Sequence, residues 1–188
     1  IRSAGVPPKV IQEAAFDFSG VLSSQVELFF ELYKGDVIAI TGTYGEGSTL
    51  ALISNVLKEA DLEHEVGGNY GIPALDLLHD DTEETELCLL ELSSFQLMNF
   101  TNRARIAVLL EVTSEHLDWH TDVEEYRNAK ANLFNNQSED DLCVYFDNNE
   151  ICKGLVKGSK ARKVRLGANS CSIHLDEGGV VWPRGGFF

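Results

Sequence analysis

An apolar run that passes through a short glycine-rich turn into an amphipathic helix constrains the fold of this chain more than any other feature. The run occupies residues 37–40 and the turn residues 42–47, and the helix is expected over 48–60. Its apolar spacing predicts that Leu52 and Val56 face the interior. A buried strand joined to a helix by so short a turn is the first half of a β-α-β unit, so we expect a parallel sheet to begin at residue 37.

The alternation of strands and helices continues toward the C-terminus. Helical spacing recurs at 73–78 and 123–135, and apolar strand-like runs occur at 87–91, 105–110 and 142–146. This order predicts an α/β fold with a doubly wound, mostly parallel sheet.

Two regions differ from this pattern. Residues 1–34 differ from the rest of the chain and are expected to form short helices at 10–15 and 25–33, which leaves 35–188 as the main domain. Beyond residue 163, short apolar runs at 164–166, 171–175 and 180–182 are separated by turns. We expect these runs to form a small antiparallel addition near the C-terminus.

Acidic residues outnumber basic residues by 30 to 15, which gives a formal net charge of −15. Duplex nucleic acid is therefore not an expected partner, because binding it needs clustered Lys and Arg. A polyphosphate ligand would have to be attracted locally, by backbone N–H groups at a helix start and by bound cations. No apolar run approaches the ~20 residues of a membrane span. The cysteines lack metal-binding spacing and are expected to be reduced thiols of a cytoplasmic protein.

The glycine-rich turn has the setting of a phosphate-binding loop, between a strand and a helix. Its candidate contacts with a nucleotide are Gly42, Thr43, Gly45, Glu46, Gly47, Ser48 and Thr49. The glycines let backbone N–H groups approach phosphate, the helix start favours negative charge, and Ser48 or Thr49 could ligate Mg²⁺. With such a loop the sheet would be of the P-loop NTPase type.

Glu46 argues against that interpretation, because phosphate loops carry a lysine for the outer phosphates. Two like charges about 4 Å apart repel by ~4 kcal/mol at an effective dielectric constant of 20. A glycine turn and helix cap without phosphate affinity therefore competes evenly as an explanation of the loop taken alone.

Polar side chains near the ends of the expected strands form a second group of candidates. Glu91 ends one strand, His116 follows the next, and Lys130 lies on the helix after that. In a doubly wound sheet, the ends of adjacent strands open into one crevice, where carboxylate and imidazole groups suit Mg²⁺ or Mn²⁺. Taken singly, His116 could instead cap a loop, and a helix lysine such as Lys130 is more often solvated.

A second glycine-rich turn spans residues 67–73 and leads into the expected helix at 73–78. Its plain interpretation is a tight turn, with Pro73 at the helix start. Alternatively, Asn69 could hold a ligand through its side-chain amide.

Several of these segments, in this order and spacing, resemble the Mur ligase family, the ATP-dependent amide ligases of peptidoglycan precursor synthesis. The matching segments are Gly67-Gly68-Asn69-x-Gly71-x-Pro73, Glu91-Leu92-Ser93-Ser94-Phe95-Gln96-Leu97, Val112-Thr113-x-x-His116 and Tyr126-Arg127-x-Ala129-Lys130. Within the family, the first two are similar to the signatures of the branch that adds D-glutamate. The folylpolyglutamate synthetase branch is a weaker match.

The resemblance implies a reaction in which ATP phosphorylates the terminal carboxylate of a UDP-linked muramoyl substrate and the amine of D-glutamate then attacks the acyl phosphate. It implies that Glu91, His116 and Lys130 are catalytic. Ser48 and Glu91 would hold one Mg²⁺, and His116 with an N-carboxylated Lys130 would hold a second. Asn69, Ser93 and Gln96 would lie along the muramoyl substrate.

The same comparison sets limits on what this chain is expected to do. The family loop has Gly-Thr-Asn-Gly-Lys where this chain has Gly42-Thr43-Tyr44-Gly45-Glu46. Residues 1–34 would be the end of a UDP-binding domain, 35–188 would be an incomplete ATP-binding domain, and the C-terminal ligase domain would be absent. We therefore expect a monomer that is inactive on its own. The alternative is a catalytically dead binding or scaffold module.

Overall fold

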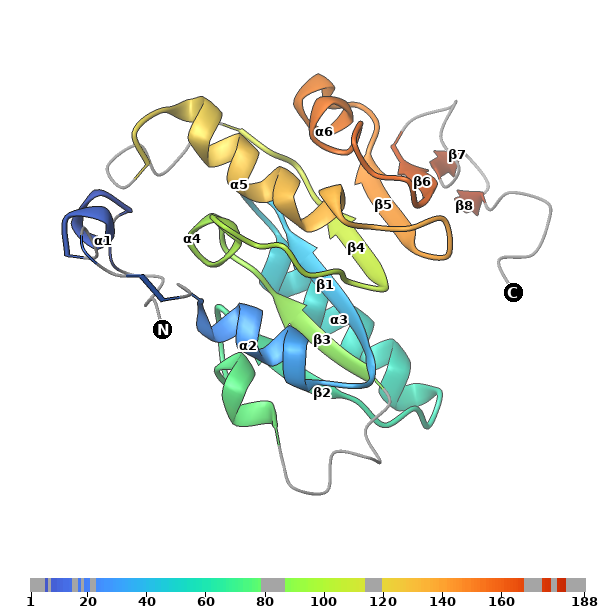
Figure 1. Ribbon diagram of the computed structural model, residues 1–188. Helices are drawn as coiled ribbons and strands as arrows, with labels where there is room; N and C mark the ends of the chain where they lie inside the picture. Colours follow the sequence, from blue (N-terminus) through green and yellow to red (C-terminus); the bar gives the residue numbers. More distant parts are fainter. Residues whose placement is uncertain are drawn as a thin grey trace.

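A six-stranded, all-parallel β-sheet forms the centre of the protein (Figure 1). The computed structural model describes residues 6, 8–14, 17, 19–20, 23–78, 87–113, 120–167, 174–176 and 179–181. The strands follow the order β2-β3-β1-β4-β5-β6 across the sheet. Their bounds are β1 (Asp36–Thr41), β2 (Glu65–Gly68), β3 (Leu87–Glu91), β4 (Ile106–Leu109), β5 (Leu142–Phe146) and β6 (Arg162–Leu166). The predicted α/β class and parallel sheet are confirmed.

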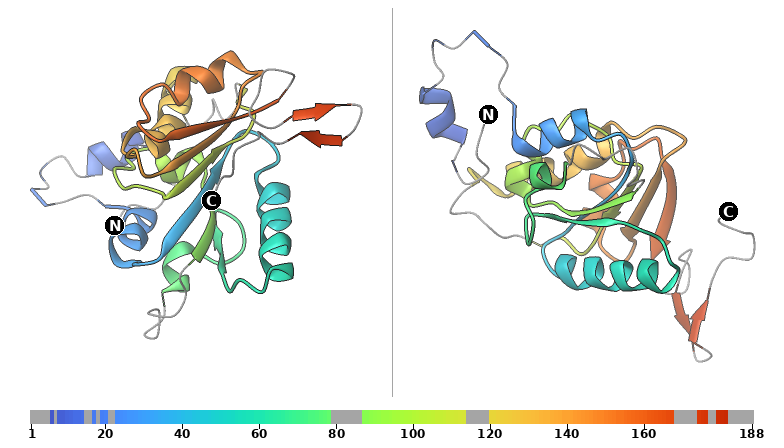
Figure 2. Two further views of the ribbon diagram at one scale, coloured as in Figure 1. Left: turned by 90° about the vertical axis from the view of Figure 1, so that its right-hand side faces the viewer. Right: turned by 90° about the horizontal axis from the view of Figure 1, so that it is seen from below.

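The helices are divided unequally between the two faces of this sheet. Their bounds are α1 (Pro8–Ala14), α2 (Gln25–Leu32), α3 (Glu46–Glu59), the 3-10 helix η1 (Ala74–Leu77), α4 (Ser94–Leu97), α5 (Val123–Asn135) and α6 (Glu150–Leu155). Figure 2 shows α3 on one face, with α2, α4 and α5 on the opposite face. Crossovers between parallel strands are right-handed, so the direction of a connection along the sheet decides which face its helix covers. Only the connection from β1 to β2, which contains α3, runs toward the β2 edge, and the later connections run toward β6. Among the described residues, no helix is long and apolar enough to cross a membrane.

The main hydrophobic core lies between the sheet and the helices opposite α3. Alternate side chains of the strands point to that face, as Cys143 and Tyr145 of β5 do, and both are buried. On the α3 side, the expectation for that helix was wrong: Leu52 and Val56 are each 67% exposed. The spacing correctly marked an apolar stripe. However, α3 is the one described helix on its face, so this part of its surface meets no neighbouring helix.

The expected antiparallel addition is corrected at its first strand. Residues 164–166 belong to β6, which pairs parallel with β5 in a register that sets Val144 opposite Val164. Helix α6, which the sequence analysis did not predict, supplies the crossover that makes β6 parallel. The six-stranded sheet carries no antiparallel strand. Strands β7 (His174–Asp176) and β8 (Gly179–Val181) pair antiparallel in a separate two-stranded sheet.

The turn after β2 depends on close backbone contacts that only glycine allows. The Gly68 N–H donates to the Ile72 carbonyl at 2.8 Å, and the Asn69 N–H donates to the Glu91 carbonyl at 2.8 Å. Gly68 has φ +113°, and a Cβ there would lie 2.2 Å from the Glu91 carbonyl oxygen. The sequence interpretation of a tight turn is confirmed, and the turn is anchored on the end of β3.

Replacing Gly68 by alanine should therefore destabilise the fold strongly. We expect Gly68→Ala to lower the free energy of unfolding by about 3 kcal/mol, because it adds a steric overlap with backbone to an unfavourable backbone conformation. Gly71→Ala is the matched control, since Gly71 also has positive φ (+83°) but has open space around its Cβ position. It should cost only about 1 kcal/mol. Chemical denaturation of both variants measures the difference, and equal losses would contradict the role given to the Glu91 contact.

Candidate functional site

The candidate site lies at the carboxyl ends of the parallel strands. Strands β1 and β4 are neighbours, but the connection after β1 runs toward one edge of the sheet and the connection after β4 toward the other. Such a divergence opens a crevice at the strand ends, where α/β proteins bind ligands. A cavity of about 220 Å³ is found there. Its lining includes the predicted residues Gly42, Thr43, Glu46, Asn69, Glu91, Ser93 and Lys130.

The glycine-rich turn is held by backbone and side-chain bonds to the segment after β4. The Thr43 N–H donates to the Glu111 carbonyl at 2.8 Å, and the Thr43 hydroxyl accepts a bond from the Thr113 N–H at 2.9 Å. Gly45 caps α3 with φ +90°, a conformation that favours glycine. The helix begins at Glu46, earlier than expected, so the other predicted loop residues, Gly47, Ser48 and Thr49, lie in its first turn.

Glu91 is oriented by Asn69, the residue that follows β2. The Asn69 side-chain amide donates to Glu91 Oε1 at 3.1 Å, in addition to the backbone bond between the same two residues. A Cβ on Gly47 would lie 3.4 Å from Glu91 Oε2. The carboxylate therefore faces the first turn of α3, where Ser48 also lies. Asn69 and Glu91, predicted as separate features, form one unit in the structure.

Lys130 is buried beneath the loop, with 2% of its surface exposed, so the solvated alternative is wrong. Its Nζ donates to the Thr41 hydroxyl at 3.2 Å and to the Gly42 carbonyl. Burial lowers the Lys130 pKa from 10.5 to about 8, and the carboxylates of Glu46 and then Glu91 act in the opposite direction. Both acidic side chains thus act electrostatically on this ammonium group, whose hydrogen bonds go to Thr41 and Gly42.

The serine-rich segment after β3 forms the short helix α4 and its cap. The Ser93 hydroxyl accepts a bond from the Gln96 N–H at 3.4 Å, while Gln96 Oε1 accepts from the Ser93 N–H at 3.0 Å. This is a capping box, so the two predicted substrate contacts also hold each other. Ser93 lines the cavity, and the carbonyl oxygen of Gln96 is committed to the cap.

Two side chains that the sequence analysis did not assign complete the site. The Tyr126 hydroxyl is hydrogen-bonded to the Thr43 hydroxyl at 2.9 Å, and His120 Nε2 to the Ser94 hydroxyl at 2.9 Å. Tyr126 and His120 are both buried. The available signal was the four-residue spacing from Tyr126 to Lys130, which places both side chains on one face of α5.

The metal-binding prediction can be followed only in part. His116 lies outside the described residues. Within the described ranges, no group of three or more His, Cys, Asp or Glu side chains is close enough to hold a metal ion. The Glu91 carboxylate and the Ser48 hydroxyl are hard oxygen donors of the kind that Mg²⁺ prefers. Lys130 as an ammonium group cannot ligate a cation, whereas N-carboxylation would give it the carboxylate oxygens that Mg²⁺ prefers.

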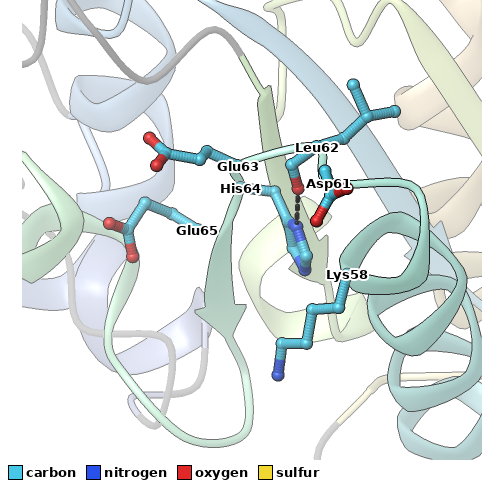
Figure 3. A pocket seen from close by; sticks show the side chains of 6 residues that line it. All are labelled: Lys58, Asp61, Leu62, Glu63, His64 and Glu65. Carbon is cyan, nitrogen blue, oxygen red and sulfur yellow. Dashed lines mark hydrogen bonds between the residues drawn. The ribbon is translucent and has the colours of Figure 1, made fainter.

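A larger hollow of about 540 Å³ lies between the end of α3 and the start of β2 (Figure 3). Lys58, Asp61, Leu62, Glu63, His64 and Glu65 line it. His64 bonds to the Leu62 carbonyl at 2.8 Å and to the Ser54 hydroxyl at 2.8 Å, so both ring nitrogens have structural partners. This hollow is at the opposite end of β2 from the turn at Asn69, and none of the predicted site residues lines it.

A parallel sheet with a glycine loop after β1, and with carboxylate, amide and lysine groups converging on that loop, is an α/β domain with a polar crevice at its strand ends. The chain belongs to the Mur ligase family. Residues 40–179 match the Mur ligase middle domain, and this match agrees with the sequence resemblance.

Two relatives illustrate how much of a longer protein the chain represents. It is 39% identical over 145 residues to the UDP-N-acetylmuramoylalanine--D-glutamate ligase of Clostridium perfringens, with 77% of this chain and 31% of the relative covered. It is 42% identical over 185 residues to the protein of that name from Ruminiclostridium cellulolyticum, with 98% and 39% covered. The chain therefore spans about a third of the length of these relatives.

Solved structures of the family share the fold. The UDP-N-acetylmuramate:L-alanyl-gamma-D-glutamyl-meso-diaminopimelate ligase from Neisseria meningitides superposes with a TM-score of 0.69 at 17% identity, covering 97% of this chain and 63% of that one. The MurF ligase of Thermotoga maritima, solved in complex with ADP, gives 0.61 at 20% identity, covering 84% and 40%.

The buried ammonium group should make stability depend on pH. Between pH 8 and 10.5 the unfolded chain keeps the Lys130 proton while the folded chain has lost it, so the free energy of unfolding should rise with pH. The two pKa values correspond to roughly 3 kcal/mol. We expect the native protein to gain about this much relative to Lys130→Met across that range, measured by denaturation at several pH values. Groups common to both proteins cancel, and a difference that does not change with pH would contradict the assignment.

Proposed function

We propose that this chain is the ATP-binding part of a ligase that joins D-glutamate to UDP-N-acetylmuramoyl-L-alanine. The observation that carries the proposal is the convergence of Asn69, Glu91 and Lys130 on the cavity at the glycine loop. The names and identities of the sequence relatives support the D-glutamate branch. ADP in the Thermotoga maritima structure supports ATP as the nucleotide.

The proposed reaction has two steps, and the roles proposed for residues of this chain belong to the first. An oxygen of the substrate carboxylate attacks the γ-phosphorus of ATP, which gives an acyl phosphate and ADP. The D-glutamate nitrogen then attacks the acyl carbon, loses a proton and expels inorganic phosphate. In this proposal the N–H groups at the start of α3 hold the phosphates, while Asn69, Ser93 and Gln96 position the muramoyl substrate.

The proposed metal ligands divide into two sets. Ser48 and Glu91 would hold one Mg²⁺, and His116 with an N-carboxylated Lys130 would hold a second. Mg²⁺ would offset the charge that develops on the transferred phosphoryl group. Asn69 supports the first set by fixing one oxygen of Glu91, which leaves the other turned to the loop.

Glu46 favours a second candidate, a catalytically dead binding or scaffold module. Its side chain lines the cavity and lies close enough to Lys130 to influence the pKa of that lysine. Lys130 is the one cationic side chain among the described residues that line the cavity. A glutamate in the position of the family lysine adds negative charge where the phosphates would bind.

The whole reaction is proposed for the longer protein. We propose that residues 1–34 end a UDP-binding domain and that 35–188 belong to an ATP-binding domain. The C-terminal ligase domain would be needed for D-glutamate. The chain itself would be an inactive monomer, and the longer protein would act in the cytoplasm.

Calorimetric titration of Mg-ATP into the native chain and into Glu46→Lys and Glu46→Gln tests the proposal. We expect Glu46→Lys to bind at least about tenfold more tightly than the native chain, because a like-charge repulsion becomes an attraction. Glu46→Gln should lie between them, since it removes the repulsion without adding a cation.

Each alternative outcome has a definite meaning. If no variant binds Mg-ATP, the site is not an ATP site in this chain and the scaffold candidate is preferred. Equal affinity in the native chain and Glu46→Lys would contradict the electrostatic role given to Glu46. Turnover of D-glutamate by the native chain alone would contradict its expected inactivity.

A further inference from the structure

The order of the strand ends shows what lies beside the glycine loop on its β3 side. Glu91 ends β3, which lies between β1 with its glycine loop and β2 with its turn. In register, Ile40 of β1 and Gly68 of β2 both stand opposite Glu91. Neighbouring strands are about 4.8 Å apart, so the β2 turn lies roughly 10 Å from the loop. A substrate whose carboxylate meets the loop beside Glu91 and that extends away from β4 would lie over the β2 turn.

Tyr70 stands at the tip of that turn. Its side chain is 81% exposed, the largest value among the exposed large hydrophobic residues of the described chain. Its neighbour Asn69 turns inward and bonds to Glu91. The turn is closed on both sides, by the Gly68 bond to Ile72 and by the Asn69 bond to the Glu91 carbonyl. Tyr70 is therefore presented to solvent by a clamped backbone.

An aromatic ring held in this way suits the binding of a ligand ring. An exposed tyrosine has few rotatable bonds to immobilise, and its apolar face can cover the C–H face of a sugar. The side chain of the preceding residue, Asn69, lines the cavity together with Glu91, to which its amide donates. Tyr70 follows Asn69 in the chain, so it offers an exposed aromatic surface next to a lining residue of that cavity, on the side away from the glycine loop.

We propose that Tyr70 is a specificity-determining residue that stacks on the muramoyl sugar ring of the carboxylate-bearing substrate. This inference rests on the proposed function, since the substrate is the UDP-linked muramoyl compound. It assigns Tyr70 to the sugar and not to the adenine of ATP. The nucleotide phosphates belong to the β1 loop, which is separated from the β2 turn by β3.

Saturation-transfer NMR with UDP-N-acetylmuramoyl-L-alanine tests this contact on the chain as it is. With the native protein we expect saturation of the protons of the muramoyl sugar ring. In Tyr70→Ala we expect that saturation to be lost and the dissociation constant to rise about tenfold. Tyr70→Phe, which keeps the ring, should preserve both. Leu62→Ala is the matched control, because Leu62 is also exposed (53%) but lies at the opposite end of β2.

The outcomes separate this inference from the proposed function. If the native chain binds and Tyr70→Ala gives the same proton pattern and affinity, the stacking contact is wrong and the proposed substrate stands. If Tyr70→Phe is as weak as Tyr70→Ala, the hydroxyl is the contact and stacking is wrong. If the native chain saturates no substrate proton, both the inference and the muramoyl substrate fail for this chain. A loss in Leu62→Ala would show that any surface change weakens binding, which also overturns the inference.

Discussion

The hold of α5 on the glycine loop is the interaction on which the candidate site depends. Lys130 bonds to Thr41 and Gly42 at the end of β1, and Tyr126, one helical turn earlier, is hydrogen-bonded to Thr43. Asn132 on the same helix donates to the Leu97 and Met98 carbonyls at the end of α4. One helix thus fixes the loop after β1 relative to the helix after β3. Because these side chains are mostly buried, a displaced α5 would leave polar groups without partners.

Most strands of the sheet could be predicted from the sequence, whereas the packing of helices on the sheet could be predicted less well. Strand and helix periodicity is a local property, so β1, β3, β4 and β5 were found close to their true bounds. The parallel pairing of β6 was missed because it depends on α6, a six-residue helix whose start is set by the Asn149 side chain. The exposure of Leu52 and Val56 could not be predicted from their spacing. Spacing shows that a helix has an apolar face, but burial also requires another element that packs against that face.

The site shows the same division between residue identity and environment. Glu91 and Asn69 could be named from their positions after apolar runs, but their mutual bond depends on the β2–β3 register. Lys130 alone was more consistent with a solvated lysine, and only the fold places it under the loop at 2% exposure. His120 could not be assigned from sequence, since its bond to Ser94 joins segments 26 residues apart.

The charges around the loop bear on the two candidate functions, an altered nucleotide site and a binding or scaffold module. A lysine at position 46 would give the cavity two cations against Glu91, whereas the observed residues give one cation against Glu46 and Glu91. The difference is two formal charges in a protein whose net charge is already −15. The backbone of the loop nevertheless keeps the left-handed Gly45, the helix start and the bonds of Thr43. A loop that keeps this backbone while carrying Glu46 fits the proposal of a nucleotide site altered at one position, because only the side-chain charge and not the backbone differs from what that proposal needs.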